Sequence, residues 1–342
     1  MRYVVEADVS GGAEAYVARL AAAFGGDIVS AGPPPPGLRA TEAPRPRGKG
    51  DVGALLGLAR ALRGADLVHV NASEPANNRY GMAAALLARV PYVVTLHSPS
   101  GLAGGAQDRV LRRLYGGARA VIAVSQETAG LLREGLGVTA SVIPNGVELP
   151  PALARRPHAR PRVGTLGRLS GEKGVDVLLA AARGLDVEVH VAGDGPERAA
   201  LQAGAGANVT FHGQVPDPAA FLAGLDVFCL PSRVEGLPFA LLEAMASGLA
   251  VVATRVGDVP EALGDAGLLV DPGNPVALRE ALAALARDPL RRNDLGAAAR
   301  ARIAERYTAE LMVERTAAVY AAAAGSSPPP RRRRAPAPPP AR

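Results

Sequence analysis

The sequence predicts an α/β protein made of two doubly wound parallel sheets, each Rossmann-like, that face one another across a cleft. Three observations support this prediction. Short apolar runs alternate with longer helix-compatible segments almost throughout the chain. Many of these runs are continuously apolar, which is typical of strands covered by helices on both faces. Residues 148–162, rich in Pro and Arg and without helical or strand period, separate two sets of runs.

Each apolar run is expected to form one strand, and strand, helix and strand in succession imply right-handed crossovers. The first set of runs is RYVVE, GDIVSA, ADLVHV, PYVVTLH, AVIAVS and SVIPNG. The second set is RVGTLGRL, VEVHVAG, NVTFHG, DVFCLPS, LAVVATRV and AGLLV. Because parallel sheets bind ligands at the carboxyl ends of their strands, the polar residues just after each run are the candidates for function.

A chain of 342 residues is long enough for two cores. We expect a first domain over residues 1–150 and a second over 151–307, followed by a helix at 308–324. Residues 325–342, rich in Pro and Arg, have the composition of a disordered tail. The segment 31–50 is expected to be an irregular loop because of its many prolines.

Composition narrows the possible functions. The formal charge is +6, but five arginines lie in the last 18 residues without an acidic residue among them, so the remaining chain is nearly neutral. With no Trp and 4% aromatic residues, the chain lacks the stacking side chains of single-stranded nucleic-acid binders. No apolar run is long enough to cross a bilayer and no signal-peptide core is present, so we expect a cytoplasmic protein. The single cysteine, Cys229, is expected in the core.

The stretch EGLPFALLEAMASG (235–248) predicts a buried helix with one carboxylate in its middle. Pro238 suits a first helical position and Gly248 suits a C-terminal stop. Glu243 lies among apolar residues, and a buried carboxylate needs partners. An ion pair with an arginine and a contact to a ligand explain it equally well. Glu235, just before the helix, adds a second carboxylate that could hold hydroxyl groups of a sugar or ribose.

The stretch GRLSGEKGVDVLLAA (167–181) begins at a strand end and enters a helix at about Gly174. A lysine before a helix N-terminus opposes the helix dipole, which favours anions there. A bound phosphate would bring together Lys173, Arg168 and the helix end. The alternative is a solvated lysine, but Lys173 is one of only two lysines in the chain, which favours the phosphate.

Three features of the first half are weaker signals when taken singly. Gly11 and Gly12 follow the first strand, where they would allow close approach of a ligand or of the opposite domain, or form a plain turn. His97 ends a strand and faces the expected cleft, although a lone histidine is more often structural. Asn145 lies in the turn IPNGVE, which alone would be an Asn-Gly turn.

Several reaction classes lack their motifs. The five histidines are scattered and no Cys/His or Asp-x-Asp cluster has metal-ligand spacing. Neither Gly-x-Ser-x-Gly, nor a Walker loop, nor Gly-x-Gly-x-x-Gly after the first strand occurs. These absences disfavour hydrolase, ATPase and Rossmann dehydrogenase functions.

Taken together and in order, the motifs resemble those of family 4 glycosyltransferases. They are SGGAE, TLH, IPNGVE, GRLSGEKG, VAGDGPER, FHGQV and EGLPFALLEAMASG, followed by VVATRVG and PE. The resemblance covers residues 1 to about 320 and is strongest from 143 to 271. It implies a retaining enzyme of the GT-B fold that transfers a sugar, expected to be a hexose, from a nucleotide-diphosphate sugar.

The resemblance also implies roles for single residues. Glu235 would contact the donor sugar, and Glu243 would hold the ribose hydroxyls. Arg168 and Lys173 would neutralise the diphosphate, so that no metal or other cofactor is needed. His97 would lie near the transferred sugar. As catalytic residues we therefore expect His97, Glu235, Arg168 and Lys173.

Further donor-binding positions follow from the matched motifs: Gly11, Gly12, Asn145, Gly167, Gly236 and Leu237. The first domain would hold the acceptor, the second would hold the donor, and the final helix would pack back against the first. The expected partners are the donor and a carbohydrate, lipid or small-molecule acceptor, with no nucleic acid. The chain departs from the family in VGDVPE, where Asp258 replaces a common glycine.

Three alternatives remain open at this point. An inactive relative would bind nucleotide sugars without turnover. An epimerase or hydrolase of the same architecture would turn over the donor without an acceptor. The tail 325–342 could dock partners or lie peripherally on an anionic membrane, although a solvated extension explains its composition as well.

Overall fold

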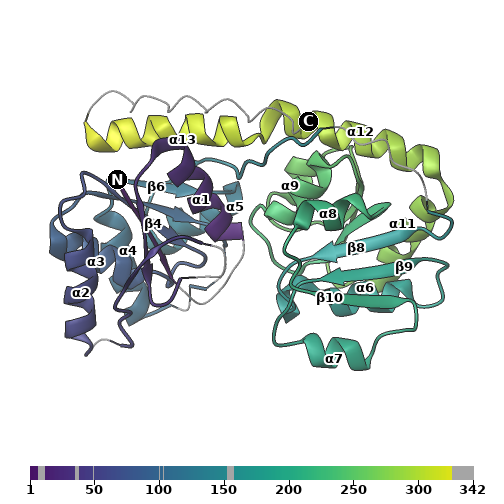
Figure 1. Ribbon diagram of the computed structural model, residues 1–342, viewed down its shortest axis with the longest axis horizontal. Helices are drawn as coiled ribbons and strands as arrows, with labels where there is room; N and C mark the ends of the chain where they lie inside the picture. Colours follow the sequence, from purple (N-terminus) through teal and green to yellow (C-terminus); the bar gives the residue numbers. More distant parts are fainter. Residues whose placement is uncertain are drawn as a thin grey trace, which may run out of the picture.

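The computed structural model describes residues 1–6, 12–34, 38–48, 50–99, 101–102, 104–151 and 158–325. Two parallel sheets stand side by side, each with helices on both faces, and the last helix runs back over the first sheet (Figure 1). Gly11, residues 152–157 of the expected linker and residues 326–342 of the expected tail lie outside the described residues.

The first sheet has the strand order β3-β2-β1-β4-β5-β6-β7, with all neighbours parallel. Its strands are β1 (Arg2–Glu6), β2 (Asp27–Ala31), β3 (Thr41–Ala43), β4 (Val68–Ala72), β5 (Tyr92–Leu96), β6 (Ala120–Ala123) and β7 (Ser141–Val142). The expectation that 31–50 has no regular structure is wrong at β3. These three residues include no proline, and an edge strand tolerates prolines beside it because one of its sides needs no hydrogen-bond partner.

The second sheet has the order β10-β9-β8-β11-β12-β13, again parallel throughout. Its strands are β8 (Arg162–Leu166), β9 (Glu188–Ala192), β10 (Val209–Gly213), β11 (Val227–Leu230), β12 (Ala250–Thr254) and β13 (Leu268–Val270). Strands β11 and β12 are buried along their full length, as their continuously apolar sequences predict. Cys229 lies within β11 and is fully buried, which confirms it as a core residue.

The helices of the first part of the chain form two layers. Helices α2, α3 and α4 share one core with Val4 of β1, whereas α1 shares the other with Tyr3 and Val5, because successive strand residues point to opposite faces. The bounds are α1 (Gly12–Phe24), α2 (Val52–Leu62), α3 (Arg79–Ala88), α4 (Ala106–Gly116), α5 (Gln126–Leu131) and the π-helical turn η1 (Leu132–Leu136).

The second sheet is covered in the same way. Helices α6 and α11 pack into one core, and α8, α9, α10 and α12 into the other. The bounds are the 3₁₀ turn η2 (Gly171–Lys173), α6 (Val175–Ala182), α7 (Arg198–Ala203), α8 (Pro218–Ala223), α9 (Phe239–Ala246), α10 (Val259–Leu263), α11 (Pro275–Arg287) and α12 (Pro289–Arg306).

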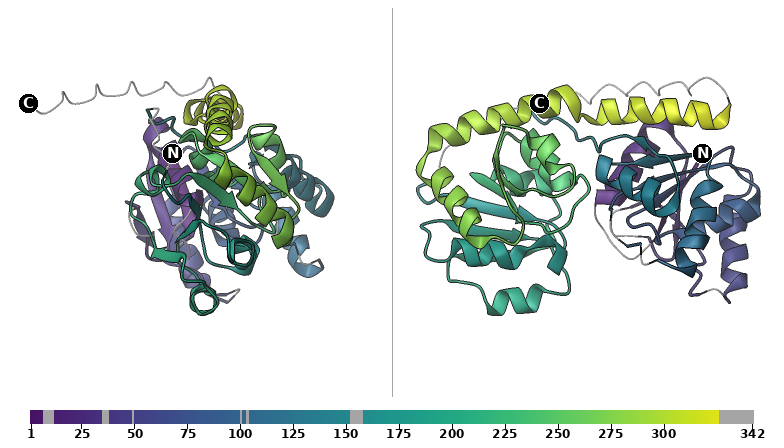
Figure 2. Two further views of the ribbon diagram at one scale, coloured as in Figure 1. Left: turned by 90° about the vertical axis from the view of Figure 1, so that its right-hand side faces the viewer. Right: turned by 180° about the vertical axis from the view of Figure 1, so that it is seen from behind.

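The C-terminal helices connect the two sheets. Helix α12 lies on the second sheet, and α13 (Ala309–Ala324) lies along the first, as the right-hand view in Figure 2 shows. Between them Thr308 pairs with Val147 in an isolated parallel bridge, and its hydroxyl accepts the backbone N–H of Leu311 to cap α13. No helix in the described part of the chain is both long and apolar enough to span a bilayer.

Candidate active site

The turn before α9 is where the two sheets meet at their carboxyl ends. A Cβ added to Gly236 would lie 2.6 Å from the carbonyl oxygen of His97, so only a glycine allows this approach. Asn145 donates from Nδ2 to the carbonyl oxygen of Leu237 at 2.6 Å. A Cβ on Gly12, the first residue of α1, would lie 2.6 Å from the Phe239 ring. Residues predicted separately from both halves of the sequence therefore converge on residues 236–239.

Helix α9 differs in two respects from its prediction. Pro238 has an extended backbone (φ −75°, ψ 135°) and precedes the helix instead of starting it. Glu243 is not fully buried, because 27% of its side chain is exposed. The rest of the helix is mostly buried, and Ser247 followed by Gly248 (φ +70°) ends it as predicted.

Arg19 of α1 supplies the partner of Glu243. Its Nη2 lies 3.6 Å from Oε1 of Glu243, its Nη1 donates to the Gly146 carbonyl at 3.0 Å, and its guanidinium stacks over Phe239 at 5.0 Å. Burial raises the pKa of Glu243, and Arg19 opposes that rise. Glu243 thus has the arginine partner that is one of its two predicted explanations. This arginine comes from α1, which packs on the other sheet.

Lys173 and Glu235 contact one another directly. Lys173 Nζ lies 2.7 Å from Glu235 Oε1, which also accepts the hydroxyl of Ser232 at 2.7 Å. Glu235 is 7% exposed, and the lysine side chain is 30% exposed. A buried carboxylate requires such partners. An ammonium group has three N–H donors, so Lys173 keeps donors for a second anion.

The loop after β8 presents the other predicted cation. Arg168 is exposed, and its guanidinium group makes no hydrogen bond or ion pair with any described residue. The loop itself is held tightly, because a Cβ on Gly193 would lie 1.8 Å from the carbonyl oxygen of Gly167. Leu169 donates to the Asp194 carbonyl at 2.9 Å. Gly167 and Arg168 thus lie on a fixed loop, without direct contact to the Lys173–Glu235 pair.

Arg233 was missed by the sequence analysis, although it lies two residues before Glu235. Its two terminal nitrogens pair with the Asp176 carboxylate at 2.9 and 2.7 Å, and it donates to the Gly171 carbonyl at 2.6 Å. It lowers the pKa of Asp176. Gly174 (φ +61°) packs against the Pro231 carbonyl, where a side chain would not fit. These contacts fix Lys173 beside Glu235.

His97 follows β5 and is neutral at physiological pH. Burial lowers its pKa to about 3. Its Nε2 lies 2.7 Å from Oδ1 of Asn71, so Nε2 carries the proton and Nδ1 is an acceptor. Tyr16 contacts the imidazole edge-on at 4.9 Å between ring centres. A neutral imidazole here can accept a hydrogen bond from a hydroxyl group but cannot supply a positive charge.

A second histidine, which is fully buried, supports this arrangement. His69 Nε2 lies 2.8 Å from the hydroxyl of Thr95, which also bonds the hydroxyl of Tyr16 at 3.3 Å. His69 Nδ1 bonds the hydroxyl of Tyr320 on α13. Burial, followed by the charge of His97, lowers the pKa of His69 to about 3. The sequence predicts His69 only as part of a strand, because Tyr320, the residue that identifies its role, is 251 positions away.

Asp258, the departure from the family pattern, links the two halves of the molecule. Its Oδ2 accepts the backbone N–H of Gln126 at 2.8 Å, and the carboxylate also accepts that of Glu127. The Glu127 carboxylate in turn accepts the backbone N–H of Gly257. Burial raises the pKa of both carboxyl groups. We call these reciprocal contacts the Asp258–Glu127 clasp.

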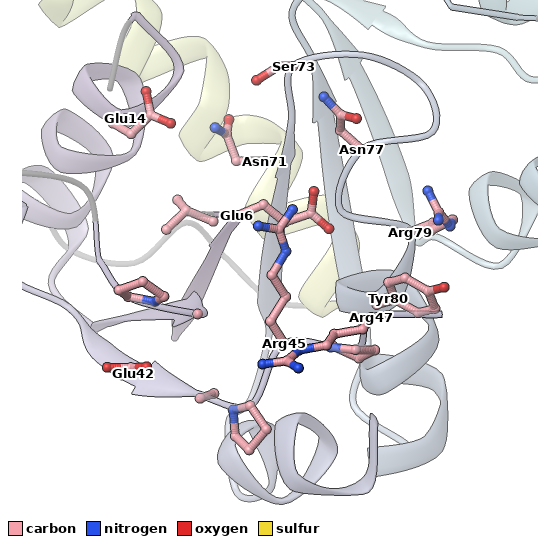
Figure 3. A pocket seen from close by; sticks show the side chains of 16 residues that line it. Glu6, Glu14, Glu42, Arg45, Arg47, Asn71, Ser73, Asn77, Arg79 and Tyr80 are labelled. Atoms are coloured by element: carbon pink, nitrogen blue, oxygen red, sulfur yellow. The ribbon is translucent and has the colours of Figure 1, made fainter. Parts of the chain in front are cut away.

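A hollow of about 640 Å³ opens beside this site at the carboxyl edge of the first sheet (Figure 3). Asn71, the partner of His97, lines it. Figure 3 shows Asn71, Ser73, Asn77 and Glu14 around its upper part and Arg79 with Tyr80 lower down. The complete lining is Val5, Glu6, Glu14, Gly32, Pro33, Glu42, Ala43, Pro44, Arg45, Pro46, Arg47, Asn71, Ser73, Asn77, Arg79 and Tyr80. Such a polar lining suits a ligand rich in hydroxyl groups or charges.

Two family models match consecutive parts of the chain. Residues 10–149 match the one described as Glycosyltransferase Family 4, and residues 160–288 match the one described as Glycosyl transferases group 1. The second match covers the β8 loop, Lys173, Glu235 and Glu243.

Similar proteins agree with these matches. The chain is 34% identical to a phosphatidyl-myo-inositol mannosyltransferase of Mycobacterium leprae, over 75% of this chain and 73% of that protein. It is 33% identical to a Bacillus subtilis protein named as a teichuronic acid biosynthesis glycosyltransferase, over 64% of this chain and 60% of that protein.

The fold has solved counterparts as well. HepE of Anabaena, crystallised with UDP-glucose, superposes with a TM-score of 0.81 at 21% identity, over 94% of this chain and 98% of that one. The chain therefore belongs to glycosyltransferase family 4, and it is a sugar-transferring enzyme with the two-domain GT-B fold.

Proposed function

We propose that the enzyme moves a hexose from a nucleotide-diphosphate sugar to an acceptor held in the hollow beside Asn71, with retention of configuration and without a metal ion. The observation that carries this proposal is the Lys173–Glu235 pair, placed at the turn whose Gly236 touches the His97 carbonyl. The names of two relatives, a mannosyltransferase for phosphatidyl-myo-inositol and a glycosyltransferase of teichuronic acid biosynthesis, support glycan or lipid acceptors.

The donor diphosphate would lie between Arg168 and Lys173. Both cations belong to one rigid loop region, and Arg168 has no competing partner among the described residues. Two positive charges at this position would stabilise the negative charge that develops on the departing nucleotide. Glu243 would hold the ribose hydroxyls, and Glu235 would contact the donor sugar, as the family resemblance implies.

The acceptor would approach from the hollow, past Asn71. At the reacting carbon, the bond from C1 to the donor phosphate breaks and its electron pair leaves on the phosphate oxygen. The acceptor oxygen forms the new bond on the same face, and its proton passes to the departing phosphate. The neutral His97 would accept a hydrogen bond from a sugar hydroxyl through Nδ1, which orients the sugar.

Donor turnover with an acceptor panel tests this proposal. The enzyme is incubated with excess chelator, one nucleotide-diphosphate sugar at a time, and acceptors representing polyols, glycans and lipid phosphates. Nucleotide release and the anomeric configuration of the product are measured. We expect acceptor-dependent release and a product with the donor's configuration. An inverted product, or turnover restored only by added Mg²⁺, would contradict the proposal. Release without any acceptor would indicate a hydrolase.

A cytoplasmic location remains a prediction from the sequence and is part of this proposal.

A further inference from the structure

We propose that the outer surface of α2, α3 and α4 docks the enzyme on an anionic lipid bilayer. The proposal does not involve the tail 325–342, for which the sequence left a membrane contact open only as an alternative. The surface is independent of the proposed donor and acceptor, since its residues lie outside the Lys173–Glu235 site.

Exposed apolar side chains concentrate on these helices. Among the described residues, nine large hydrophobic side chains are exposed, and five of them lie on α2, α3 and α4. They are Val52 (58% exposed), Leu56 (40%), Leu86 (45%), Leu87 (51%) and Val110 (49%). Single exposed hydrophobic residues are ordinary, but a cluster on neighbouring helices indicates an interaction surface.

The same surface is strongly basic. The exposed charged residues of these helices and their C-caps are Arg60, Arg63, Arg89, Arg109, Arg112 and Arg113. One exposed acid, Asp66, follows three residues after Arg63. No aspartate or glutamate of α2, α3 or α4, all described in full, is fully exposed; Asp108 is half-buried and accepts the backbone N–H of Gly104. None of the six guanidinium groups forms an ion pair with a described residue. The surface therefore carries unneutralised positive charge between its leucines and valines.

The three helices form one continuous layer. Helix α3 lies between α2 and α4 and contacts both, and all three bury their inner sides in a single core. Their outer sides consequently face in similar directions. Figure 1 places α2 and α3 at the end of the molecule away from the second sheet, with α4 beside them.

This combination fits an anionic membrane better than other partners. Arginines on apolar helices keep their charge at lipid headgroups while Leu and Val enter the acyl boundary. A second copy of the same surface would repel it through like charges. A nucleic acid would leave the five aliphatic side chains without contacts. The chain segments that begin α2 and α3 also border the hollow, through Arg47 and Arg79, so docking would bring the hollow near the lipid headgroups.

Vesicle flotation of the full-length protein tests the proposal. Vesicles of pure phosphatidylcholine are compared with vesicles containing 30 mol% phosphatidylglycerol, at low and high salt. One variant carries Arg109→Gln and Arg113→Gln, and another carries Leu86→Gln and Leu87→Gln. A third neutralises the tail through Arg331→Gln, Arg332→Gln, Arg333→Gln and Arg334→Gln.

A matched control carries Arg287→Gln, Arg291→Gln, Val276→Gln and Leu290→Gln. These residues are also exposed, but they lie on α11 and at the start of α12, among the exposed acids Glu280, Asp288 and Asp294. Thermal melts of every variant verify folding.

We expect the wild type to float with anionic vesicles only, and less at high salt because ions screen the attraction. The two α3–α4 variants should lower the partition coefficient about tenfold or more, given the contribution of each arginine near an anionic surface. The tail variant and the control should bind like the wild type. Absence of wild-type binding, equal binding to neutral vesicles, or loss in the tail variant alone would overturn the proposal.

Discussion

The ammonium group of Lys173 and the carboxylate of Glu235 lie 2.7 Å apart, between the loop after β8 and the loop after β11. Each is thereby neutralised when no anionic ligand is present, and Arg233 with Ser232 holds both loops in place. A donor diphosphate would share Lys173 with Glu235 without a rearrangement of the backbone. This pre-arranged pair is the central element of the proposed donor site.

Gly236→Ala should separate the two halves of the site. Its new methyl group would lie 2.6 Å from the His97 carbonyl, so the turn at residues 235–239 must shift. Misplacement of about 1 Å at reacting groups costs roughly a hundredfold in rate. We expect kcat/KM to fall by about that factor. Gly130→Ala is the control, because a Cβ there meets no described atom within 4 Å. If Gly236→Ala kept wild-type activity, the close approach of the two halves would not matter for catalysis.

Replacing Asp258 by Gly should weaken the clasp between the second sheet and the N-terminus of α5. The backbone N–H groups of Gln126 and Glu127 would lose their acceptor. Each lost hydrogen bond to a charged group costs about 1.5–3 kcal/mol, although water replaces part of it at this partly exposed position. We expect a larger radius of gyration by small-angle scattering and a lower kcat/KM. Asp258→Asn keeps an acceptor oxygen and should lie between the two. Unchanged scattering and kinetics for Asp258→Gly would contradict a role in closure.

Tyr320→Phe should affect the site from α13. The change leaves Nδ1 of the buried His69 without its hydroxyl partner, at a cost of about 1–3 kcal/mol in the free energy of unfolding. Because His69 positions Thr95 and Tyr16 beside His97, kcat should fall more than donor affinity. Tyr92→Phe is the control: it removes a buried hydrogen bond to the Leu114 carbonyl, away from the site. Equal effects of both variants on kcat would mean that the loss is one of stability alone.

Acid should destabilise the enzyme through His69 and His97. The pKa of each is lowered from the ordinary 6.5 to about 3 by burial, so the unfolded chain binds protons that the folded chain does not. Stability is therefore full above pH 6.5 and decreases as the pH falls toward 3. Between pH 7 and pH 5 each histidine should account for a loss of about 2 kcal/mol. Urea unfolding of the wild type and of His69→Gln measures this, and the variant should lose about 2 kcal/mol less than the wild type over this pH range. Identical pH dependence of the two proteins would exclude a neutral buried His69.

The architecture could be predicted from local patterns, because runs such as DVFCLPS and LAVVATRV are continuously apolar and are separated by helix-compatible segments. The short edge strand Thr41–Ala43 could not be predicted, because three residues are too few to show a strand's alternation of apolar and polar side chains. They form a strand only because they pair with the edge of β2. Pro238 was placed one position too far into its helix, a typical error for helix boundaries.

Within the site, Glu243 and Lys173 could be singled out because each is unusual in its local surroundings. Glu243 is a charged residue in an apolar helix, and Lys173 is a cation at a helix N-terminus. Their partners could not be identified in the same way. Arg19 is 224 positions from Glu243 and lies in a helix with no unusual feature of its own. The sequence contains 38 basic residues, and only the tertiary fold selects among them.

Calorimetric titration of Lys173→Ala with a panel of nucleotide-diphosphate sugars, in the presence of a chelator, tests the central claim most directly. The wild type, Glu243→Gln and the exposed-residue control Arg287→Ala are titrated alongside. We predict chelator-insensitive binding of one donor by the wild type and the control, weakened about tenfold or more in Lys173→Ala and also in Glu243→Gln, since hydrogen bonds to charged groups contribute about 1.5–3 kcal/mol. Wild-type affinity in Lys173→Ala would contradict the assignment of this lysine to the donor diphosphate.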